Sequence, residues 1–454
     1  MTFDDSVLKD KKHIHFIGIG GSGMYPLAQI LKAKGYFLTG SDNNETDTLK
    51  AVRNMGIPVF LGHSEKNVEG ADLIVHTAAI MSDNPELIAA KNSGALVLER
   101  SELLGIVCGG FSDSVCISGT HGKTTVSSML TQIFMEADMD PSAVIGGKLP
   151  IISGSGRVGE TDLFVCEACE YVDTFLKLSP AVSVILNIDE DHMEYFKTLD
   201  NLIASFEKFA KKATKSVIYN GDDHNTLRAI ADIPGNKRVT FGYSDINDYY
   251  PMDISFDNPS APSFKLYRRG EYLGEIVLSV PGKHNIINAV CACAVALEEG
   301  AKIEKVKEAL LHFKGAARRF EILGCVNGAT IADDYAHHPA ELKVTLETAK
   351  GLGYNRVIAV FQPFTYSRTA ILFDDFVEVL KIPDIAVLSE IMGSREKNTY
   401  NIYSSQLCEK IPGSVWFNTF EEIKNHVLSI AKEGDLIITL GCGDIYKAAK
   451  LMLE

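Results

Sequence analysis

The chain has 454 residues, of which 46% are apolar and 23% charged, and its formal net charge is −15. This length predicts about three domains, and the acidic balance argues against nucleic acid as the main partner. No run of about 20 apolar residues is present, so we expect no membrane span. The polar start lacks the apolar core of a signal peptide, and the nine scattered cysteines are typical of a reduced chain. We therefore expect a cytoplasmic protein, as a monomer or a homodimer.

Strand-like and helix-like stretches alternate along most of the chain, which predicts parallel α/β layers. The first series opens with a strand at 13–19 and a helix at 24–34 closed by Gly35. Its later strands, and those of a second and a third series, are expected at 72–76, 95–98, 114–118, 163–165, 181–187, 216–219, 356–361, 385–388 and 436–440. Residues 250–280 differ, because short alternating stretches are interrupted by Pro and Gly and predict antiparallel hairpins.

The fold class is therefore α/β with three domains. We expect a Rossmann-like domain over residues 1–110 and a central P-loop ATPase-like domain over 111–315. The central domain would have a parallel sheet with a small antiparallel section. A second Rossmann-like domain is expected over 316–454.

A glycine-rich loop follows the first predicted strand. Gly18, Gly20 and Gly23 fit the pattern G-x-G-x-x-G between a strand and a helix, with Gly21 and Ser22 inside it. Such glycines let the backbone approach a pyrophosphate at a helix N-terminus, where amides and the helix dipole favour anions. Asp42 stands about where a ribose-binding carboxylate is expected. A tight structural turn is the alternative, but the strand–turn–helix setting favours a nucleotide diphosphate.

A second loop, Gly-Thr-His-Gly-Lys-Thr-Thr at residues 119–125, lies between the strand at 114–118 and a helical stretch. Its end has the features of a P-loop: amides that cradle phosphates, Lys123 for the β- and γ-oxygens, and the Thr124 hydroxyl for Mg²⁺. Ile117 occupies the place of the first glycine of the usual pattern, so the loop is a shortened variant. We predict ATP binding here. A chain with both loops is expected to handle one nucleotide-linked substrate and one ATP.

Acidic residues and a histidine follow two strands of the second series. Glu167 comes just after the strand expected at 163–165. The next strand, expected at 181–187, is followed by Asp189, Glu190, Asp191 and His192. Carboxyl ends of strands face the ligand crevice in such sheets, so Glu167 could reach a Mg²⁺ ion on the ATP phosphates. His192 could be a metal ligand or a partner of the transferred phosphate. A solvated acidic turn is the alternative for the three acids.

These motifs resemble the Mur ligase family of peptidoglycan synthesis. The shortened ATP loop is similar to the family's loop, and Glu167 and His192 match its two metal-binding positions. Pro-Gly-Lys-His-Asn-Ile-Ile-Asn at 281–288 and Arg-Arg-Phe-Glu at 318–321 resemble its nucleotide-contacting segment and the entry to its third domain. The resemblance runs in order over nearly the whole chain.

Within the family, the segments 15–24, 333–339 and 362–369 resemble members that add L-alanine to UDP-N-acetylmuramate. Residues 167–171 are similar to the Gram-positive form. The resemblance implies a cell-wall ligase in which the carboxylate becomes an acyl phosphate and the amine of L-alanine attacks it. A ligase that recycles a preformed peptide onto the same sugar nucleotide shares several of these motifs and stays an alternative. An NAD-dependent oxidoreductase would leave the Lys123 loop unexplained, and a UDP-sugar sensor would give Lys123, Glu167 and His192 no shared purpose.

The resemblance also implies a set of site residues. The catalytic residues would be Lys123, Glu167, His192 and Arg368, and the Mg²⁺ ligands Thr124, Glu167 and His192. ATP would contact Gly119, Thr120, His121, Gly122, Lys123, Thr124, Thr125, His284, Asn285, Asn288 and Arg319. The UDP-sugar would contact Gly18, Gly20, Gly21, Ser22, Gly23, Met24, Ser41, Asp42 and His76. The amino acid would contact Asp334, Tyr335, His337, His338 and Arg368.

Several residues depart from the pattern or have another explanation. Phe364 stands where the family usually has histidine, and Thr365 where many members have arginine. Cys166 and Cys169 form a C-x-x-C pair, but no second pair has zinc-site spacing, which favours two unrelated thiols. His337 and His338 could be metal ligands, but adjacent residues at a helix start point apart, and the family analogy favours contact with substrate.

Overall fold

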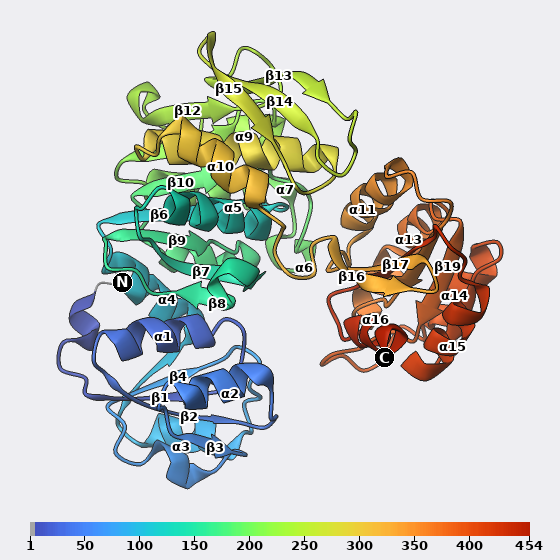
Figure 1. Cartoon of the computed structure of the whole chain (residues 1–454). Coiled ribbons are helices and arrows are strands. Elements are labelled where there is room, and N and C mark those ends of the chain that lie inside the picture. The colour runs from blue at the N-terminus through green and yellow to red at the C-terminus, as the bar shows by residue number, and fades with distance from the viewer. Residues whose placement is uncertain (1–4) are drawn as a thin grey trace. The chain divides into compact units, whose positions relative to one another are not determined.

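The computed structural model describes residues 5–454, so the first four residues of the acidic start lie outside the described part. Its strands form three sheets, each accompanied by helices (Figure 1). By its contacts the chain divides into two compact units. Unit 1 comprises the part up to Asp253, Phe264–Ile276 and Ile287–Phe313, and unit 2 comprises Ile254–Ser263, Val277–Ile286 and Lys314–Glu454.

The first sheet has the strand order β3-β2-β1-β4-β5 and is parallel throughout. Its strands are β1 (His13–Ile17), β2 (Phe37–Asp42), β3 (Val59–Leu61), β4 (Leu73–His76) and β5 (Leu96–Glu99). Its helices are η1 (Asp5–Leu8), α1 (Tyr25–Ala33), α2 (Asp47–Asn54), η2 (Glu65–Val68), α3 (Pro85–Asn92) and α4 (Arg100–Gly109). Strand β1 ends two residues before the predicted limit because Gly18 turns the chain with φ +84°. The predicted stop at Gly35, with φ +89°, is confirmed.

The second sheet has the strand order β15-β14-β13-β12-β11-β10-β6-β9-β7-β8. Its strands are β6 (Asp113–Ser118), β7 (Ser142–Leu149), β8 (Gly154–Arg157), β9 (Leu163–Glu167), β10 (Val182–Ile185), β11 (Ser216–Asn220), β12 (Arg238–Phe241), β13 (Tyr249–Ser255), β14 (Ser263–Arg268) and β15 (Glu271–Val277). Its helices are α5 (Lys123–Glu136), η3 (Pro150–Ile152), η4 (Tyr171–Lys177), α6 (Met193–Phe196), α7 (Leu199–Lys211), α8 (His224–Ala229), η5 (Gly235–Lys237), α9 (Lys283–Glu298) and α10 (Ile303–His312).

Two hairpins lie at opposite edges of this sheet. Strands β14 and β15 are joined by Arg269 and Gly270. Both residues have positive φ, as is typical of the two-residue turns that connect the strands of a tight hairpin. This agrees with the hairpins predicted over 250–280. The antiparallel pair β7–β8 at the other edge was not predicted, because its glycine-rich sequence has no clear alternation of apolar residues.

The third sheet has the strand order β16-β17-β21-β18-β19-β20. Its strands are β16 (Glu321–Val326), β17 (Ala329–Asp334), β18 (Val357–Phe361), β19 (Ile385–Ser389), β20 (Val415–Phe417) and β21 (Leu436–Leu440). Its helices are α11 (Pro339–Gly351), α12 (Tyr366–Ile371), α13 (Phe373–Val379), α14 (Ser404–Lys410), α15 (Phe420–Ile430) and α16 (Tyr446–Leu453). The antiparallel strands β16 and β17 meet at Asn327-Gly328, a typical hairpin turn, and the other pairs are parallel.

The parallel register places the carboxyl ends of neighbouring strands at one edge. In the first sheet, Ile17 pairs with Ser41 and with His76, so the Gly18 loop and Asp42 lie at the same edge. In the second sheet, Ile117 pairs with Glu167, so Glu167 and the loop at residues 119–125, the predicted ATP loop, lie at the same edge. The three sheets with their helices confirm the predicted α/β class with three domains, and the first sheet and most of the second belong to unit 1. None of the helices in residues 5–454 has both the length and the apolar character that crossing a bilayer requires.

Candidate active site

The loop at residues 119–122 joins β6 to α5 and is held tightly. Gly119 and Gly122 have φ of +137° and +89°, conformations that glycine adopts without strain. A Cβ at Gly119 would lie 2.9 Å from Leu186 Cβ, and one at Gly122 would lie 2.7 Å from Asn288 Oδ1. Because α5 begins at Lys123, the first amides of that helix have no acceptor within the helix and remain able to bind phosphate. Asn288, one of the implied ATP contacts, therefore lies against this loop.

Lys123 is paired with a carboxylate that the sequence analysis did not assign to the site. Its Nζ donates to Glu170 Oε1 at 3.1 Å and to the carbonyl oxygens of Gly119 and Thr120 at 2.5 and 3.1 Å. The Glu170 side chain is 2% exposed. Burial alone would lower the pKa of Lys123, but the acidic groups around it, Glu170 first and then Cys169 and Glu167, together outweigh burial and raise that pKa, so the ammonium stays charged.

Glu167 is oriented by two donors from neighbouring elements. The amide of Gly146 donates to Glu167 Oε1 at 2.7 Å, and Ser127 Oγ donates to the same oxygen at 3.2 Å. A Cβ at Gly146 would lie 2.4 Å from Glu167 Oε2, so only glycine allows this approach. Within residues 5–454 no donor reaches Oε2. One oxygen is thus fixed by the protein and the other is available to a ligand.

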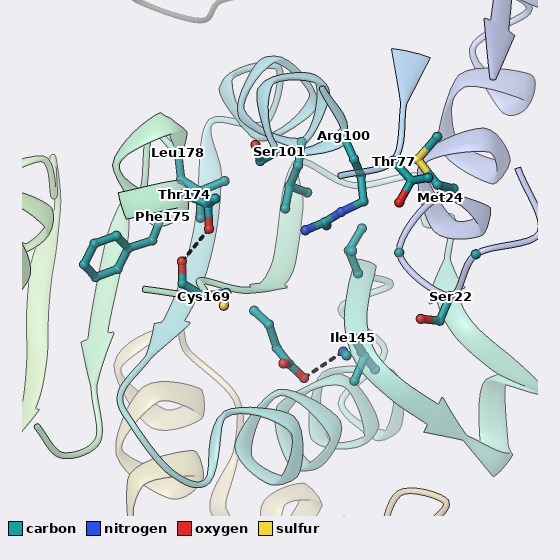
Figure 2. Close-up of a pocket in the computed structure, with 16 residues that line it drawn as sticks. Ser22, Met24, Thr77, Arg100, Ser101, Ile145, Cys169, Thr174, Phe175 and Leu178 are labelled. Atoms are coloured by element: carbon teal, nitrogen blue, oxygen red, sulfur yellow. Dashed lines mark hydrogen bonds between the residues drawn. The ribbon is translucent and has the colours of Figure 1, made fainter. Parts of the chain in front are cut away.

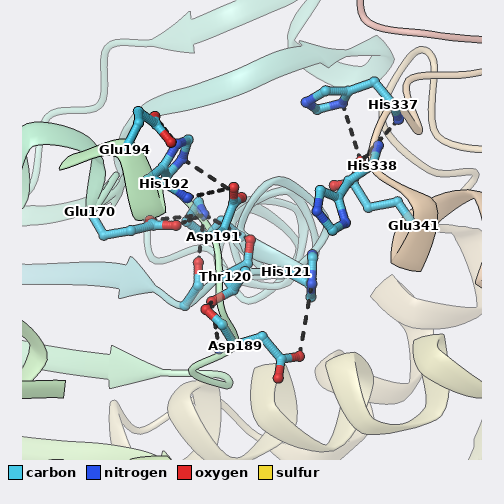
Figure 3. Close-up of polar contacts among 12 residues, drawn as sticks. Thr120, His121, Glu170, Asp189, Asp191, His192, Glu194, His337, His338 and Glu341 are labelled. Atoms are coloured by element: carbon cyan, nitrogen blue, oxygen red, sulfur yellow. Dashed lines mark hydrogen bonds and ion pairs between the residues drawn. The ribbon is translucent and has the colours of Figure 1, made fainter. Parts of the chain in front are cut away.

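The acidic turn after β10 closes over the ATP loop (Figure 3). Asn187 Oδ1 accepts from the His121 amide at 2.8 Å, and Thr120 Oγ1 accepts from the Asp189 amide at 2.9 Å. His121 Nε2 lies 3.9 Å from Asp189 Oδ2. The Asp189 backbone therefore supports the loop, while its carboxylate is 67% exposed, so metal binding and a solvated turn both stay open for these acids.

His192 is the N-cap residue just before the short helix α6 and lies in the left-handed region, with φ 57°. Its Nε2 lies 3.7 Å from Asp191 Oδ2 and its Nδ1 lies 3.6 Å from Glu194 Oε1 (Figure 3). The Tyr171 ring lies beside it, with ring centroids 4.7 Å apart. No hydrogen bond or ion pair joins His192 to Glu167 in the described part of the chain.

The glycine loop of the first sheet keeps two amides free. Gly18 donates its amide to Ser41 O, and Gly20 donates to Asp42 Oδ2 at 2.9 Å. The amides of Ser22 and Gly23 have no acceptor among the described residues. They lie just before α1, where an anion is favoured. The loop therefore has the features of an anion site.

A cavity of about 350 Å³ connects this loop with Glu167, both within unit 1 (Figure 2). The second sheet contributes Val144 to Gly146 from β7, and the start of α4 contributes Arg100 and Ser101. The complete lining is Gly21, Ser22, Gly23, Met24, Thr77, Arg100, Ser101, Leu104, Val144, Ile145, Gly146, Glu167, Cys169, Thr174, Phe175 and Leu178. Four of the expected UDP-sugar residues and one expected metal ligand thus share one cavity. Gly18, Gly20, Ser41, Asp42 and His76 do not line it.

Ser41, Asp42 and His76 make internal contacts in this structure. Ser41 Oγ is fully buried and donates to Glu86 Oε2 at 2.7 Å. The Asp42 carboxylate accepts from the amides of Gly20 and Asn44. His76 Nδ1 lies 3.1 Å from Thr77 O. Their predicted contacts with the sugar nucleotide stay predictions.

The remaining implied ATP residues lie in unit 2. Asn285 Nδ2 donates to Pro281 O at 2.7 Å, and His284 follows the turn glycine Gly282. The Arg319 guanidinium lies over the Tyr335 ring, 5.4 Å from its centroid. None of these contacts tests a role in ATP binding.

Four of the implied amino-acid contacts surround the start of α11. The Asp334 carboxylate is buried and accepts from the Phe320 and Ala336 amides, at 2.7 and 2.8 Å. Burial raises its pKa. The Tyr335 ring packs edge-on against the His337 ring. Glu341 accepts from the His337 and His338 amides (Figure 3).

His338 is the N-cap of α11 and accepts from the Ala340 amide through Nδ1 at 3.3 Å. Together, these bonds show that the Asp334 carboxylate and the His338 ring already support the local backbone. Contact of either with an amino acid stays a prediction.

Arg368 differs from these residues. It lies on α12 and is partly exposed, and its guanidinium has no hydrogen bond or ion pair among the described residues. Thr365 just before the helix has φ 63°, which is uncommon for a β-branched residue, and its amide donates to Met392 O. The unusual Phe364 pairs in a bridge with Met392. Arg368 is thus a free cation beside a strained turn.

The C-x-x-C cysteines lie in different surroundings. Cys166 is buried with its Sγ 3.5 Å from Cys116 Sγ, which lies 3.7 Å from Cys108 Sγ, while Cys169 is exposed. Cys108, Cys116 and Cys166 belong to the hydrophobic core of unit 1. The pair is therefore two unrelated thiols, as the spacing favoured.

Comparison with known proteins gives one family over most of the chain. The model of the Mur ligase family catalytic domain matches residues 13–112, the Mur ligase middle domain matches 117–296, and the Mur ligase glutamate ligase domain matches 318–443.

Two curated relatives match over nearly their whole length. A UDP-N-acetylmuramate–L-alanine ligase of Clostridium botulinum (strain Loch Maree) is 42% identical and covers 100% of both chains. The protein of the same name from Caldanaerobacter subterraneus subsp. tengcongensis is 42% identical over 98% of both chains. A solved UDP-N-acetylmuramate-alanine ligase of Thermotoga maritima is 26% identical, with a TM-score of 0.82 over 98% of both chains. The murein peptide ligase of Psychrobacter arcticus is 24% identical, with a TM-score of 0.74 over 97% of this chain and 98% of that chain, and shows the fold alone.

Proposed function

The chain belongs to the Mur ligase family, and from this premise we propose that it joins L-alanine to the carboxylate of UDP-N-acetylmuramate with ATP as the energy source. The single observation that carries the proposal is the cavity that Glu167 shares with the anion-binding loop at Gly21 to Gly23. A sugar nucleotide bound by this loop would extend into the sheet that also carries the ATP loop. The product would be a precursor of peptidoglycan.

The chemistry requires two steps. A carboxylate is a poor electrophile because its leaving group would be oxide. Transfer of the γ-phosphoryl group of ATP to a carboxylate oxygen gives an acyl phosphate and ADP. The neutral amine of L-alanine then attacks the carbonyl carbon, the amide bond forms, phosphate leaves, and the amine releases its proton to solvent.

The chain's own residues serve the first step mainly through charge. Lys123 stays protonated beside Glu170 and would neutralise the β- and γ-phosphate oxygens. The amides at the start of α5 would donate to the same phosphates. Because these groups are held before the substrate arrives, they stabilise the charge of the transition state at little reorganisation cost.

The donor set of the ATP site also fits Mg²⁺, a hard cation that prefers oxygen ligands. Glu167 Oε2 is available, and Gly146 and Ser127 fix the other oxygen of that carboxylate. Thr124 would add a hydroxyl oxygen, and His192, beside Asp191 and Glu194, would add a ring nitrogen, which this ion prefers less. Bound there, the ion would offset the charge on the phosphates.

Arg368 would orient the carboxylate of L-alanine by a bidentate contact. Its guanidinium has no protein partner in the described part of the chain, which favours a role toward a ligand. The alternative peptide-recycling activity uses the same sugar nucleotide. It differs from the proposed one in its second substrate, which is a preformed peptide in place of L-alanine. Cytoplasmic location and a monomeric or dimeric state stay predictions from the sequence.

The test is a product assay. The protein is incubated with UDP-N-acetylmuramate, ATP and Mg²⁺, and separately with L-alanine, glycine, L-serine or a preformed tripeptide, and the products are identified by mass. We expect an L-alanine adduct with one ADP formed per amide bond. A tripeptide adduct without an alanine adduct would replace the proposal by the recycling activity.

A further inference from the structure

Arg100 is the only cationic side chain among the residues that line the cavity, and Glu167 is the only anionic one. Figure 2 shows the Arg100 side chain extending into the cavity from the start of α4. No hydrogen bond or ion pair of its guanidinium occurs within residues 5–454. Arg100 is partly buried and has no protein partner for its guanidinium among the described residues, so the cation is available to an anionic ligand in the cavity.

The carboxylates nearest to Arg100 in the chain are already engaged. Glu99 and Glu102 form a capping box at the start of α4, and Glu99 also accepts from Ser101 Oγ at 2.9 Å. Lys177 lies 3.8 Å from Glu99 Oε2. The backbone of Arg100 is thus fixed, while its side chain is left for another partner.

The guanidinium lies against the end of the glycine loop. A Cβ built on Gly23 would lie 3.0 Å from Arg100 Cδ, 3.2 Å from Nη1 and 3.3 Å from Nε. The Gly23 amide and the neighbouring Ser22 amide are the two without acceptors. Two free amides, the N-terminus of the nine-residue helix α1 and a free guanidinium therefore share one wall of the cavity.

We propose that Arg100 binds the diphosphate of the sugar nucleotide and completes the anion site that Ser22 and Gly23 begin. The inference rests on the proposed function for the identity of that nucleotide. The planar guanidinium can donate two parallel hydrogen bonds to phosphate oxygens, which a lysine cannot reproduce. The protein has a net charge of −15, so a cation at this wall would offset the repulsion that a dianionic ligand meets.

The sugar nucleotide carries a second anionic group, the carboxylate to which the amino acid is joined. The experiment therefore has to distinguish binding of Arg100 to the diphosphate from binding to this carboxylate. Binding of UDP, UDP-N-acetylglucosamine and UDP-N-acetylmuramate is measured by calorimetry for the wild type, Arg100→Gln and Arg100→Lys. UDP and UDP-N-acetylglucosamine have the diphosphate without the carboxylate. Arg228→Ala is the matched control, because Arg228 pairs on the surface with Asp200 at 2.6 Å and lies outside the cavity.

We expect Arg100→Gln to raise the Kd of all three uridine nucleotides by about 10- to 100-fold. Arg100→Lys should restore part of that loss, and Arg228→Ala should bind as the wild type does. ATP affinity and the melting temperature should stay close to wild type in every variant, which a merely structural role of Arg100 would not allow.

A loss confined to UDP-N-acetylmuramate would overturn the diphosphate assignment in favour of the carboxylate. Unchanged affinity for all three ligands would overturn it altogether, as would an equal loss of ATP affinity. A wild-type protein that binds UDP but does not ligate L-alanine would contradict the proposed function, while the comparison of Arg100 variants on UDP would still decide this inference.

Discussion

Lys123 and Glu170 form a buried ion pair at the proposed ATP site, with side chains that are 16% and 2% exposed. Glu170 would be left as an uncompensated buried charge if Lys123 were shortened. Breaking such a pair from one side costs about 3–5 kcal/mol, whereas removing both charges is far less costly. Lys123 therefore stabilises the fold by pairing with Glu170, in addition to the role in phosphate binding that the loop sequence predicts.

We expect Lys123→Ala to lower turnover by about 10²-fold or more, because a charge that stabilises phosphoryl transfer is lost. The same variant should be destabilised by about 3 kcal/mol. The double variant Lys123→Met, Glu170→Gln should regain most of that stability without regaining activity. Thermal unfolding and ATP-coupled ligation rates measure both effects. A double variant as unstable as Lys123→Ala would contradict the buried-charge argument, and activity within a few-fold of wild type would contradict the ATP assignment.

At the scale of elements, a buried network ties three parts of the first sheet together. Glu86 on α3 accepts from Ser41 of β2 at 2.7 Å and lies 2.7 Å from His15 Nε2 of β1 and 2.5 Å from His63 Nδ1. Burial acts to raise the pKa of Glu86, but the hydrogen bonds from His15, Ser41 and His63 outweigh it and hold that pKa below its usual value. The network thus depends on an ionised carboxylate.

A lowered carboxyl pKa stabilises the fold above the unfolded-state value of about 4.5, and the stabilisation is lost as pH falls through the folded-state pKa. We expect protection of β1 and β2 in hydrogen exchange to decrease below about pH 4.5 in the wild type. In Glu86→Gln protection should be lower at pH 7 and less dependent on pH. Strands β18 and β21 of the other unit are the internal control. An identical pH profile for the two proteins in β1 and β2 would show that Glu86 does not carry this effect.

The two glycine loops belong to different sheets, so a change in one should spare the other. A Cβ at Gly20 would lie 2.9 Å from Asp42 Oδ2 and 3.3 Å from Leu49 Cδ1. Gly20→Val should therefore separate the loop from β2 and weaken UDP-sugar binding by at least about 10-fold, with ATP binding retained. Calorimetry with each nucleotide is the measurement. Gly235→Val is the control, since a Cβ there meets nothing within 4 Å. Equal loss of both affinities would mean that the variant has unfolded.

At the scale of the whole molecule, the two chemical steps are assigned to different units. Lys123, Glu167 and the cavity lie in unit 1, and Arg368 lies in unit 2. In the proposed mechanism, the acyl phosphate forms from the sugar's carboxylate before L-alanine takes part. Residues for the amino acid can therefore be removed without abolishing the first step.

We expect Arg368→Ala to raise the KM for L-alanine far more than that for ATP, because its target is the amino-acid carboxylate. Isotope exchange between ADP and ATP in the presence of UDP-N-acetylmuramate should stay within a few-fold of wild type. Lys381→Ala, on the surface beside Glu378, is the control. Collapse of the exchange together with ligation would assign Arg368 to the phosphate step.

Sequence analysis identified site residues that are neighbours in the chain and missed those whose partners lie far away in the chain. Residues of the loops at 18–23 and 119–125 are neighbours in the chain, so a local pattern identifies them. Glu170 and Arg100 act across long separations, 47 positions in the case of Glu170 and Lys123, and no local spacing predicts such a pair. Both do follow the ends of parallel strands, β9 and β5, which is the one signal that could have marked them.

Asp334 shows that the sequence can identify a residue without indicating whether that residue is free to bind a ligand. The family resemblance implies contact with the amino acid, yet its carboxylate accepts from Phe320 and Ala336 amides and from Thr345 Oγ1. A sequence motif identifies the residue type but not the hydrogen bonds that are already made. The predicted contact therefore stays open, whereas Arg368, without a protein partner in the described part, is the stronger candidate.

The sequence by itself determined the α/β class, the three domains and the positions of the two glycine-rich loops, because periodicity and glycine spacing are properties of short segments. Only the tertiary structure decided which side chains are free to meet a ligand, because hydrogen bonds that occupy Asp334, Ser41 or one oxygen of Glu167 come partly from distant elements. It also decided that the loop of the first sheet and Glu167 of the second line one cavity, since that requires the packing of two separately formed sheets.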